Sequence, residues 1–166
     1  MENMACAVEA CKALGVSDAI IKKAVKNFKG VEGRLQYVKS VKGVKIYNDN
    51  NATTPEATIA AISSLTDDGR KIILICGGAD KQLPLEDLAK TINDHVAAMI
   101  LLKGTGSKKL EPLLSAVSVS AESLKEAYEE ALQLVRVIKS VVDARGMRYL
   151  MMNAPESAVP LISRLV

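Results

Sequence analysis

The sequence has 166 residues, of which 49% are apolar and 25% charged, the balance of one soluble globular domain rather than of a disordered chain. Its apolar runs fall well below the roughly 20 residues that cross a bilayer, and the N-terminus lacks the basic and apolar regions of a signal peptide. We therefore expect a cytoplasmic protein without a membrane partner. The net charge of +3 is scattered and aromatic residues make up only 3%, which argues against nucleic acid as a partner.

The three cysteines, Cys6, Cys11 and Cys76, form an odd set without a CxxC pair. In a reducing compartment they are expected to remain small buried thiols. The sequence thus predicts neither a zinc site nor a disulfide framework.

The first 30 residues predict two helices. Apolar residues recur at helical spacing over residues 3–14 and stop at Gly15, a favourable C-terminal residue. Ser17 or Asp18 can cap a second helix that ends before Gly30. This helix would carry its apolar side chains on one face, namely Ile20, Ile21, Ala24, Val25 and Phe28.

From residue 31 onward, strands and helices alternate. Residues 35–38 and 44–47 predict a hairpin or two adjacent strands, and Thr54-Pro55-Glu56 begins a helix. Residues 71–76 form a β-branched run of the kind that is buried on both faces of a parallel sheet. Further helices are expected at 85–92, 107–114 and 123–142, and further strands at 97–102, 117–119 and 147–152. This alternation predicts an α/β fold with an open, doubly wound, mostly parallel sheet, preceded by an N-terminal helical segment.

Ligands bind such sheets beyond the carboxyl ends of the strands, and three strand-to-helix junctions stand out there. Residues 48–54 are either an Asx-rich turn or a binding site. Residues 77–81 are either a tight glycine turn or an anion site with Lys81 as its charge. Residues 103–107 lack the spacing of a phosphate-binding loop and are interpreted as a turn with a weak nucleotide signal.

Four segments in this order resemble consecutive landmarks of the Mur ligases. They are ENMACA at residues 2–7, FKGVEGRLQ at 28–36, YNDNNATTP at 47–55 and LICGGADK at 74–81. The similarity extends from residue 2 to about 110 and is strongest to the branch of the family that adds D-glutamate. It implies a Rossmann-like C-terminal domain.

The resemblance also implies a reaction and a set of site residues. Such a ligase uses ATP and Mg²⁺ to activate the carboxylate of UDP-N-acetylmuramoyl-L-alanine as an acyl phosphate, which the amine of D-glutamate attacks during peptidoglycan synthesis. By position, Asn3 would contact adenine and Asp49 the ribose, while Arg34 would reach the phosphates and act in catalysis. Thr53 and Lys81 would hold the carboxylates of D-glutamate.

In this comparison, residues 1–30 correspond to the end of a central ATP-binding domain and residues 31–166 to the C-terminal domain. The P-loop and the Mg²⁺ ligands would belong to the central domain ahead of Met1, so no metal ligand is assigned here and the chain alone is expected to be inactive. Its partners would be its own central and N-terminal domains. Asn50 and Asn51 replace the family's usual serine and lysine, and Ser157 is left unassigned because the family's C-terminal landmark is not legible.

Two alternatives remain. One is a stand-alone module that binds a nucleotide or an acidic amino acid, and a P-loop motif upstream in the reading frame would argue against it. The other is a Mur or folylpolyglutamate ligase with another amino-acid substrate. The diaminopimelate-adding branch typically carries an Asp-Asn-Pro-Arg element, and this sequence does not contain one.

Overall fold

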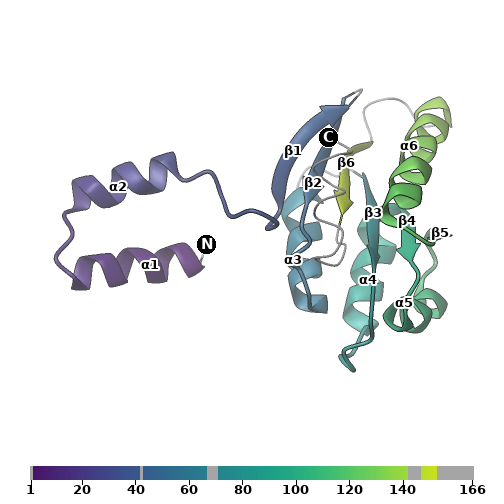
Figure 1. Ribbon diagram of the computed structural model, residues 1–166, viewed down its shortest axis with the longest axis horizontal. Helices are drawn as coiled ribbons and strands as arrows, with labels where there is room; N and C mark the ends of the chain where they lie inside the picture. The colour runs from purple at the N-terminus through teal and green to yellow at the C-terminus, as the bar shows by residue number, and fades with distance from the viewer. Residues whose placement is uncertain (1, 42, 67–70, 142–146, 153–166) are drawn as a thin grey trace. The chain divides into compact units, whose positions relative to one another are not determined.

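The computed structural model describes residues 2–41, 43–66, 71–141 and 147–152 (Figure 1). The chain divides into two compact units, Met1–Val31 and Glu32–Val166. Ser157, for which the sequence supported no role, lies outside the described residues. None of the described helices is long and apolar enough to cross a membrane.

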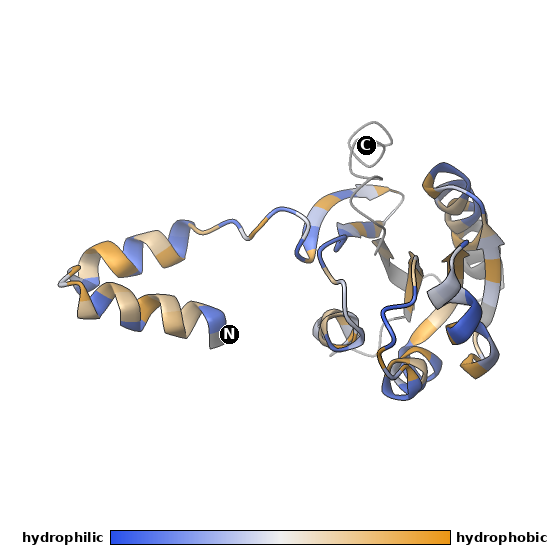
Figure 2. Cartoon of the chain, turned by 60° about the horizontal axis from the view of Figure 1, so that its bottom comes forward, coloured by the Kyte–Doolittle hydropathy of each residue, from blue (hydrophilic) through white to orange (hydrophobic). Residues whose placement is uncertain are grey.

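The first unit consists of helices α1 (Glu2–Ala13) and α2 (Asp18–Asn27), as the sequence predicts. Gly15, at φ +77°, ends the first helix, and its N–H donates to the Lys12 carbonyl at 2.9 Å. Apolar segments occur along both helices (Figure 2), and Ile20 is 61% exposed whereas Ile21 is buried. Cys6 is also exposed and Cys11 is only partly buried, so the predicted burial was wrong for both, whereas Cys76 is buried as predicted.

The second unit is built on a six-stranded sheet in the order β1-β2-β6-β3-β4-β5. The strands β2 to β6 run parallel to one another, and β1 pairs with β2 antiparallel. Their bounds are β1 (Gln36–Val41), β2 (Val44–Asn48), β3 (Lys71–Gly77), β4 (Val96–Leu102), β5 (Val117–Ala121) and β6 (Met147–Met152). The predicted hairpin and the mostly parallel sheet are confirmed.

The helices cover both faces of this sheet (Figure 1). The helices α3 (Pro55–Thr66), α4 (Glu86–His95) and α5 (Thr105–Leu110) connect β2, β3, β4 and β5 in turn and lie on one face. On the opposite face, α6 (Leu124–Val141) returns the chain to β6, which lies between β2 and β3. Winding in one direction along one face and back along the other makes the sheet doubly wound.

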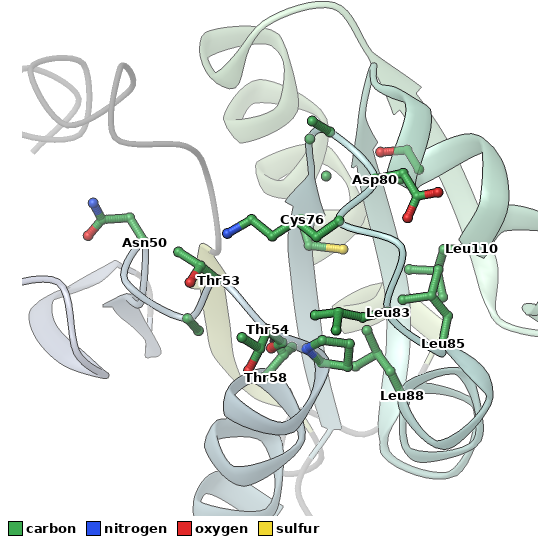
Figure 3. Close-up of a pocket in the computed structure, with 18 residues that line it drawn as sticks. Asn50, Thr53, Thr54, Thr58, Cys76, Asp80, Leu83, Leu85, Leu88 and Leu110 are labelled. Atoms are coloured by element: carbon green, nitrogen blue, oxygen red, sulfur yellow. Dashed lines mark hydrogen bonds between the residues drawn. The ribbon is translucent and has the colours of Figure 1, made fainter.

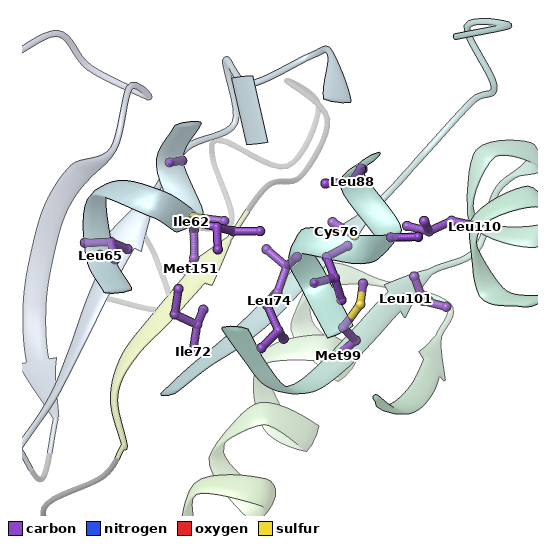
Figure 4. Packing of buried hydrophobic residues seen from close by; sticks show 14 residues of the cluster. Ile62, Leu65, Ile72, Leu74, Cys76, Leu88, Met99, Leu101, Leu110 and Met151 are labelled. Atoms are coloured by element: carbon purple, nitrogen blue, oxygen red, sulfur yellow. The ribbon is translucent and has the colours of Figure 1, made fainter. Parts of the chain in front are cut away.

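The core has two halves because side chains of β3 alternate between the two faces. Ile73 and Ile75 pack in the cluster under α6, whereas Ile72, Leu74 and Cys76 pack against α3, α4 and α5 (Figure 4). Complete burial of one such aliphatic side chain contributes about 1.5–3 kcal/mol. The prediction that residues 71–76 form a strand buried on both faces is confirmed, since 72–76 are all buried.

The helix predicted at 107–114 differs from expectation at both ends. It begins earlier, at Thr105, and its α-helical part ends at Leu110. Residues Glu111–Leu113 continue as one 3₁₀ turn, which contains Pro112. Proline has no N–H to donate to the carbonyl four residues earlier, so the α-helical hydrogen bonding stops there.

Candidate functional site

A pocket of about 410 Å³ opens at the carboxyl ends of β2, β3 and β4 (Figure 3). All three junctions singled out in the sequence contribute to its wall, through Asn50 and Thr53 after β2, Lys81 after β3, and Ser107 after β4. Because β6 lies between β2 and β3, the pocket sits where the winding of the sheet reverses direction. That is the position at which open α/β sheets bind ligands.

The loop after β2 is shaped by its own polar side chains. The buried Asn48 amide oxygen accepts the N–H of Asn50 at 3.2 Å, which is an Asx turn. Thr54 directly precedes α3 and caps it, since its hydroxyl oxygen accepts the N–H of Ala57 at 3.4 Å. The turn interpretation is therefore correct for Asn48 and Thr54, while Thr53 between them is exposed and lines the pocket.

Residues 32–35, which we call the strap, lie against this loop. The N–H of Leu35 donates to Asp49 Oδ1 at 2.7 Å, and the N–H of Asn51 donates to the Gly33 carbonyl at 3.0 Å. Gly33 and Leu35 both adopt positive φ, at +69° and +42°. The strap therefore holds the exposed Arg34 close to the loop that follows β2.

Asp49 is a buried carboxylate, only 5% exposed. Its Oδ1 accepts the Leu35 N–H, but Oδ2 is buried and has no hydrogen-bond partner among the described residues. Burial raises the pKa of Asp49, against the lowering effects of the Leu35 hydrogen bond and the Arg34 charge. A buried acceptor without a donor is costly in a native protein, so within the described ranges Oδ2 is an unsatisfied polar atom beside the strap.

The loops after β3 and β4 are joined to each other. The N–H of Gly106 donates to the Gly78 carbonyl at 2.9 Å, and the N–H of Asp80 donates to the Thr105 hydroxyl at 2.8 Å. The loop at residues 103–107 therefore holds the loop at residues 77–81 in place. Gly77 lies at φ +148°, where a side chain would meet the backbone of β4, so this turn requires glycine as predicted.

Lys81 and Thr53 line the same pocket from the loops after β3 and β2. Both residues are exposed, and within the described parts of the chain Lys81 has no hydrogen bond or ion pair. Its neighbour Asp80 instead lies 3.6 Å from the ammonium group of Lys109. Lys81 is thus a cation available to an acidic ligand in this pocket.

The remaining wall of the pocket is apolar and was not predicted. It is formed by Leu83, Leu85, Leu88 and Leu110, with Cys76 between the two sides (Figure 3). Burial raises the pKa of the Cys76 thiol to about 12, so the thiol is protonated at neutral pH. In the sequence these residues carry only the apolar signal of helix and strand cores, which does not distinguish a pocket wall from packing.

The five predicted site residues are not all brought together. Thr53 and Lys81 share the pocket, and Arg34 lies near enough to Asp49 for its charge to lower the pKa of that carboxyl. Asn3 lies exposed on α1 in the first unit, so the structure does not join it to the other four. Among the described residues, no three or more acidic, histidine or cysteine side chains are grouped as they would be in a metal site.

The sequence profile described as "Mur ligase, glutamate ligase domain" matches residues 33–145, which lie within the second unit. The chain belongs to the Mur ligase family. This confirms the resemblance that residues 28–36, 47–55 and 74–81 indicated.

Relatives with assigned names point to one branch of the family. The chain is 45% identical over 120 residues to a UDP-N-acetylmuramoylalanine–D-glutamate ligase of Roseiflexus sp. (strain RS-1), covering 72% of this chain and 25% of that protein. A ligase of the same name from Thermoanaerobacter sp. (strain X514) is 35% identical over 142 residues, covering 79% of this chain and 30% of that protein. The chain therefore spans less than a third of the length of these relatives.

Solved Mur ligase structures share the fold. MurF from Acinetobacter baumannii superposes with a TM-score of 0.68 at 18% identity, over 98% of this chain and 36% of that one. MurF from Thermotoga maritima in complex with ADP gives a TM-score of 0.62 at 19% identity, again over 98% of this chain and 36% of that one. These similarities confirm the Rossmann-like, doubly wound fold.

Proposed function

We propose that this chain is the amino-acid-binding part of an ATP-dependent ligase that adds D-glutamate to UDP-N-acetylmuramoyl-L-alanine in peptidoglycan synthesis. The observation that carries the proposal is the convergence of Thr53 and Lys81 on one pocket at the reversal point of the sheet. The 45% identity to a ligase named for D-glutamate supports this choice of amino acid.

The chemistry of the pocket suits a dicarboxylate. A carboxylate favours a fixed cation and hydroxyl or backbone donors, which Lys81, Thr53 and the glycine turn at 77–78 supply from neighbouring loops. The apolar wall on the other side excludes water and strengthens these charged contacts. In this arrangement, Thr53 and Lys81 orient D-glutamate so that its amine meets the activated carboxylate.

The nucleotide would lie at the strap. Asp49 Oδ2, buried and without a partner among the described residues, would accept a ribose hydroxyl. Arg34 beside it would pair with phosphate oxygens and stabilise charge that develops during phosphoryl transfer. Asn3 on α1 would contact the adenine. The P-loop and Mg²⁺ would be supplied by the rest of the ligase, with residues 1–30 as the end of its central domain.

The proposed substrates also indicate in which compartment of the cell the reaction would occur. UDP-N-acetylmuramoyl-L-alanine and ATP are cytoplasmic metabolites, so the ligase would act in the cytoplasm. Its macromolecular partners would be its own central and N-terminal domains, which close on the pocket and complete the site.

Binding of D-glutamate to this chain tests the pocket directly. We expect an NMR titration to shift the amides of Thr53, Gly78 and Lys81, with a Kd on the order of 1 mM, or about −4 kcal/mol. Lys81→Ala removes a charge-assisted hydrogen bond of about 1.5–3 kcal/mol and should weaken binding by roughly tenfold or more. Lys90→Ala, at an exposed α4 lysine outside the pocket, is the matched control. A D-glutamate titration that Lys81→Ala leaves unchanged would remove Lys81 from the site.

Activity is tested in a chimera in which this chain replaces the matching segment of the Roseiflexus ligase. The chimera is supplied with UDP-N-acetylmuramoyl-L-alanine, ATP and, in parallel, D-glutamate, L-glutamate, L-lysine and diaminopimelate. We expect ligation of D-glutamate alone. Preference for another amino acid would overturn the assigned substrate. The proposed function would be overturned if the folded chimera ligates none of the amino acids and the isolated chain does not bind D-glutamate.

A further inference from the structure

Asn51 stands where the family usually has a lysine, and the structure gives this asparagine contacts of its own. Its side-chain amide donates to the Glu32 carbonyl at 3.0 Å, and its backbone N–H donates to the Gly33 carbonyl at 3.0 Å. Both acceptors are in the strap, which is separated from Asn51 by the whole β1–β2 hairpin. Asn51 therefore joins the loop after β2 to the beginning of the strap.

The end of the strap is fixed independently. There the Leu35 N–H donates to Asp49 Oδ1 at 2.7 Å. Close packing adds to these bonds, because a Cβ on Gly33 would collide with the amide oxygen of Asn50 and lie 2.7 Å from Asn51 Nδ2. Hydrogen bonds thus fix both ends of the strap, and Arg34 lies between the two fixed ends.

We infer that Asn51 is a positioning residue, which holds the strap so that Arg34 lies beside Asp49. The inference rests on the proposed function and deepens it, because it assigns a role to a position at which the family pattern fails. Arg34 is exposed and has a long side chain, so its backbone must be fixed before its guanidinium can meet a phosphate reproducibly. A neutral amide achieves this without placing a second cation next to Asp49.

Asn51→Ala tests the inference, since it removes the bond to Glu32 and leaves the backbone bond to Gly33. The matched control is Asn93→Ala. Asn93 also bridges distant backbone groups, donating to the Leu113 carbonyl at 3.1 Å and accepting the Ser115 N–H at 2.8 Å, but it lies outside the pocket. Each variant is measured for amide hydrogen exchange in this chain and for steady-state kinetics in the Roseiflexus chimera.

For Asn51→Ala we expect faster exchange of the Leu35 amide and a roughly tenfold lower kcat, with an unchanged KM for D-glutamate. Asn93→Ala should lower the melting temperature without changing kcat. Wild-type kcat and Leu35 exchange in Asn51→Ala would overturn the inference, as would an equal effect of the control on kcat. If Asn51→Ala does not fold, Asn51→Asp keeps the size of the side chain but removes the N–H that donates to Glu32, and it should show the same split between kcat and KM.

If the proposed function is wrong, the same measurements give a different result. In that case the unsubstituted chimera does not ligate and this chain does not bind D-glutamate, while Leu35 exchange still reports whether Asn51 holds the strap. If the unsubstituted chimera is active and Asn51→Ala retains its kcat, only the positioning role is lost.

Discussion

Alanine substitutions of Gly77 and Gly78 measure, as a difference in unfolding free energy, how closely the ends of β3 and β4 approach each other. The two glycines have similar positive φ angles, +148° and +141°. An alanine Cβ at position 77 would collide with the Leu102 carbonyl oxygen and lie 2.7 Å from Ser107 Oγ, whereas at position 78 it would meet nothing within 4 Å. Backbone strain is therefore common to Gly77→Ala and Gly78→Ala, but the collision occurs only in the first.

The magnitudes follow from these surroundings. Holding a non-glycine residue in this region costs on the order of 1–3 kcal/mol, and overpacking against a fixed backbone costs about 1–3 kcal/mol more. The free energy of unfolding should thus fall by about 1–3 kcal/mol in Gly78→Ala and by about 2–6 kcal/mol in Gly77→Ala. Urea denaturation followed by circular dichroism resolves this, since a difference of about 2 kcal/mol shifts the midpoint by roughly 1 M. Equal midpoints for the two variants would refute the close contact between the ends of β3 and β4.

Three further outcomes are expected. A thiol reagent should label Cys6 much faster than Cys76, because Cys6 is exposed and burial raises the pKa of Cys76 to about 12; mass spectrometry of labelled peptides checks this. Burial raises the pKa of Asp49 in the folded state. The contribution of Asp49 to the free energy of unfolding is therefore complete below its unfolded-state pKa of about 3.9, and it is lost as the pH rises through the higher folded-state pKa. Asp49→Asn should therefore lose less stability than the wild type between acid and neutral pH, as urea midpoints will show. Thr54→Ala should lower the unfolding free energy by about 1 kcal/mol through loss of the α3 cap, and an unchanged midpoint would contradict the cap.

Most elements of the second unit were predictable because their signals are local. The β-branched run from Ile72 to Cys76 encodes burial on both faces directly. The place of β6 between β2 and β3 was not predictable, because it depends on pairing between segments far apart in the chain. Met151, for example, is the register partner of both Leu74 and Tyr47. Local patterns specify a strand, whereas long-range packing specifies its neighbours.

The site was predicted less completely than the fold. Resemblance identified Thr53 and Lys81, and the structure places them on one pocket. Burial of Asp49 was not predictable, since it results from the strap that covers it and the surrounding sequence is polar. The wall that includes Leu83 and Leu88 was missed for the opposite reason, because apolar residues near a helix start are ordinarily core residues.

The two sides of the pocket are held by separate sets of hydrogen bonds, which has a measurable consequence. The side chains of Asp49 and Asn51 and the backbone N–H of Asn51 join the loop after β2 to the strap, whereas the Gly106 N–H and the Thr105 hydroxyl hold the loop after β3. Asn51 and Lys81 have no hydrogen-bond partner in common among the described residues. In the chimera, the effects of Asn51→Ala and Lys81→Ala on kcat/KM should therefore add to within about 0.5 kcal/mol. A larger interaction energy would mean that the strap and the β3 loop act as one unit, and that the nucleotide and amino-acid ends of the site are not positioned independently.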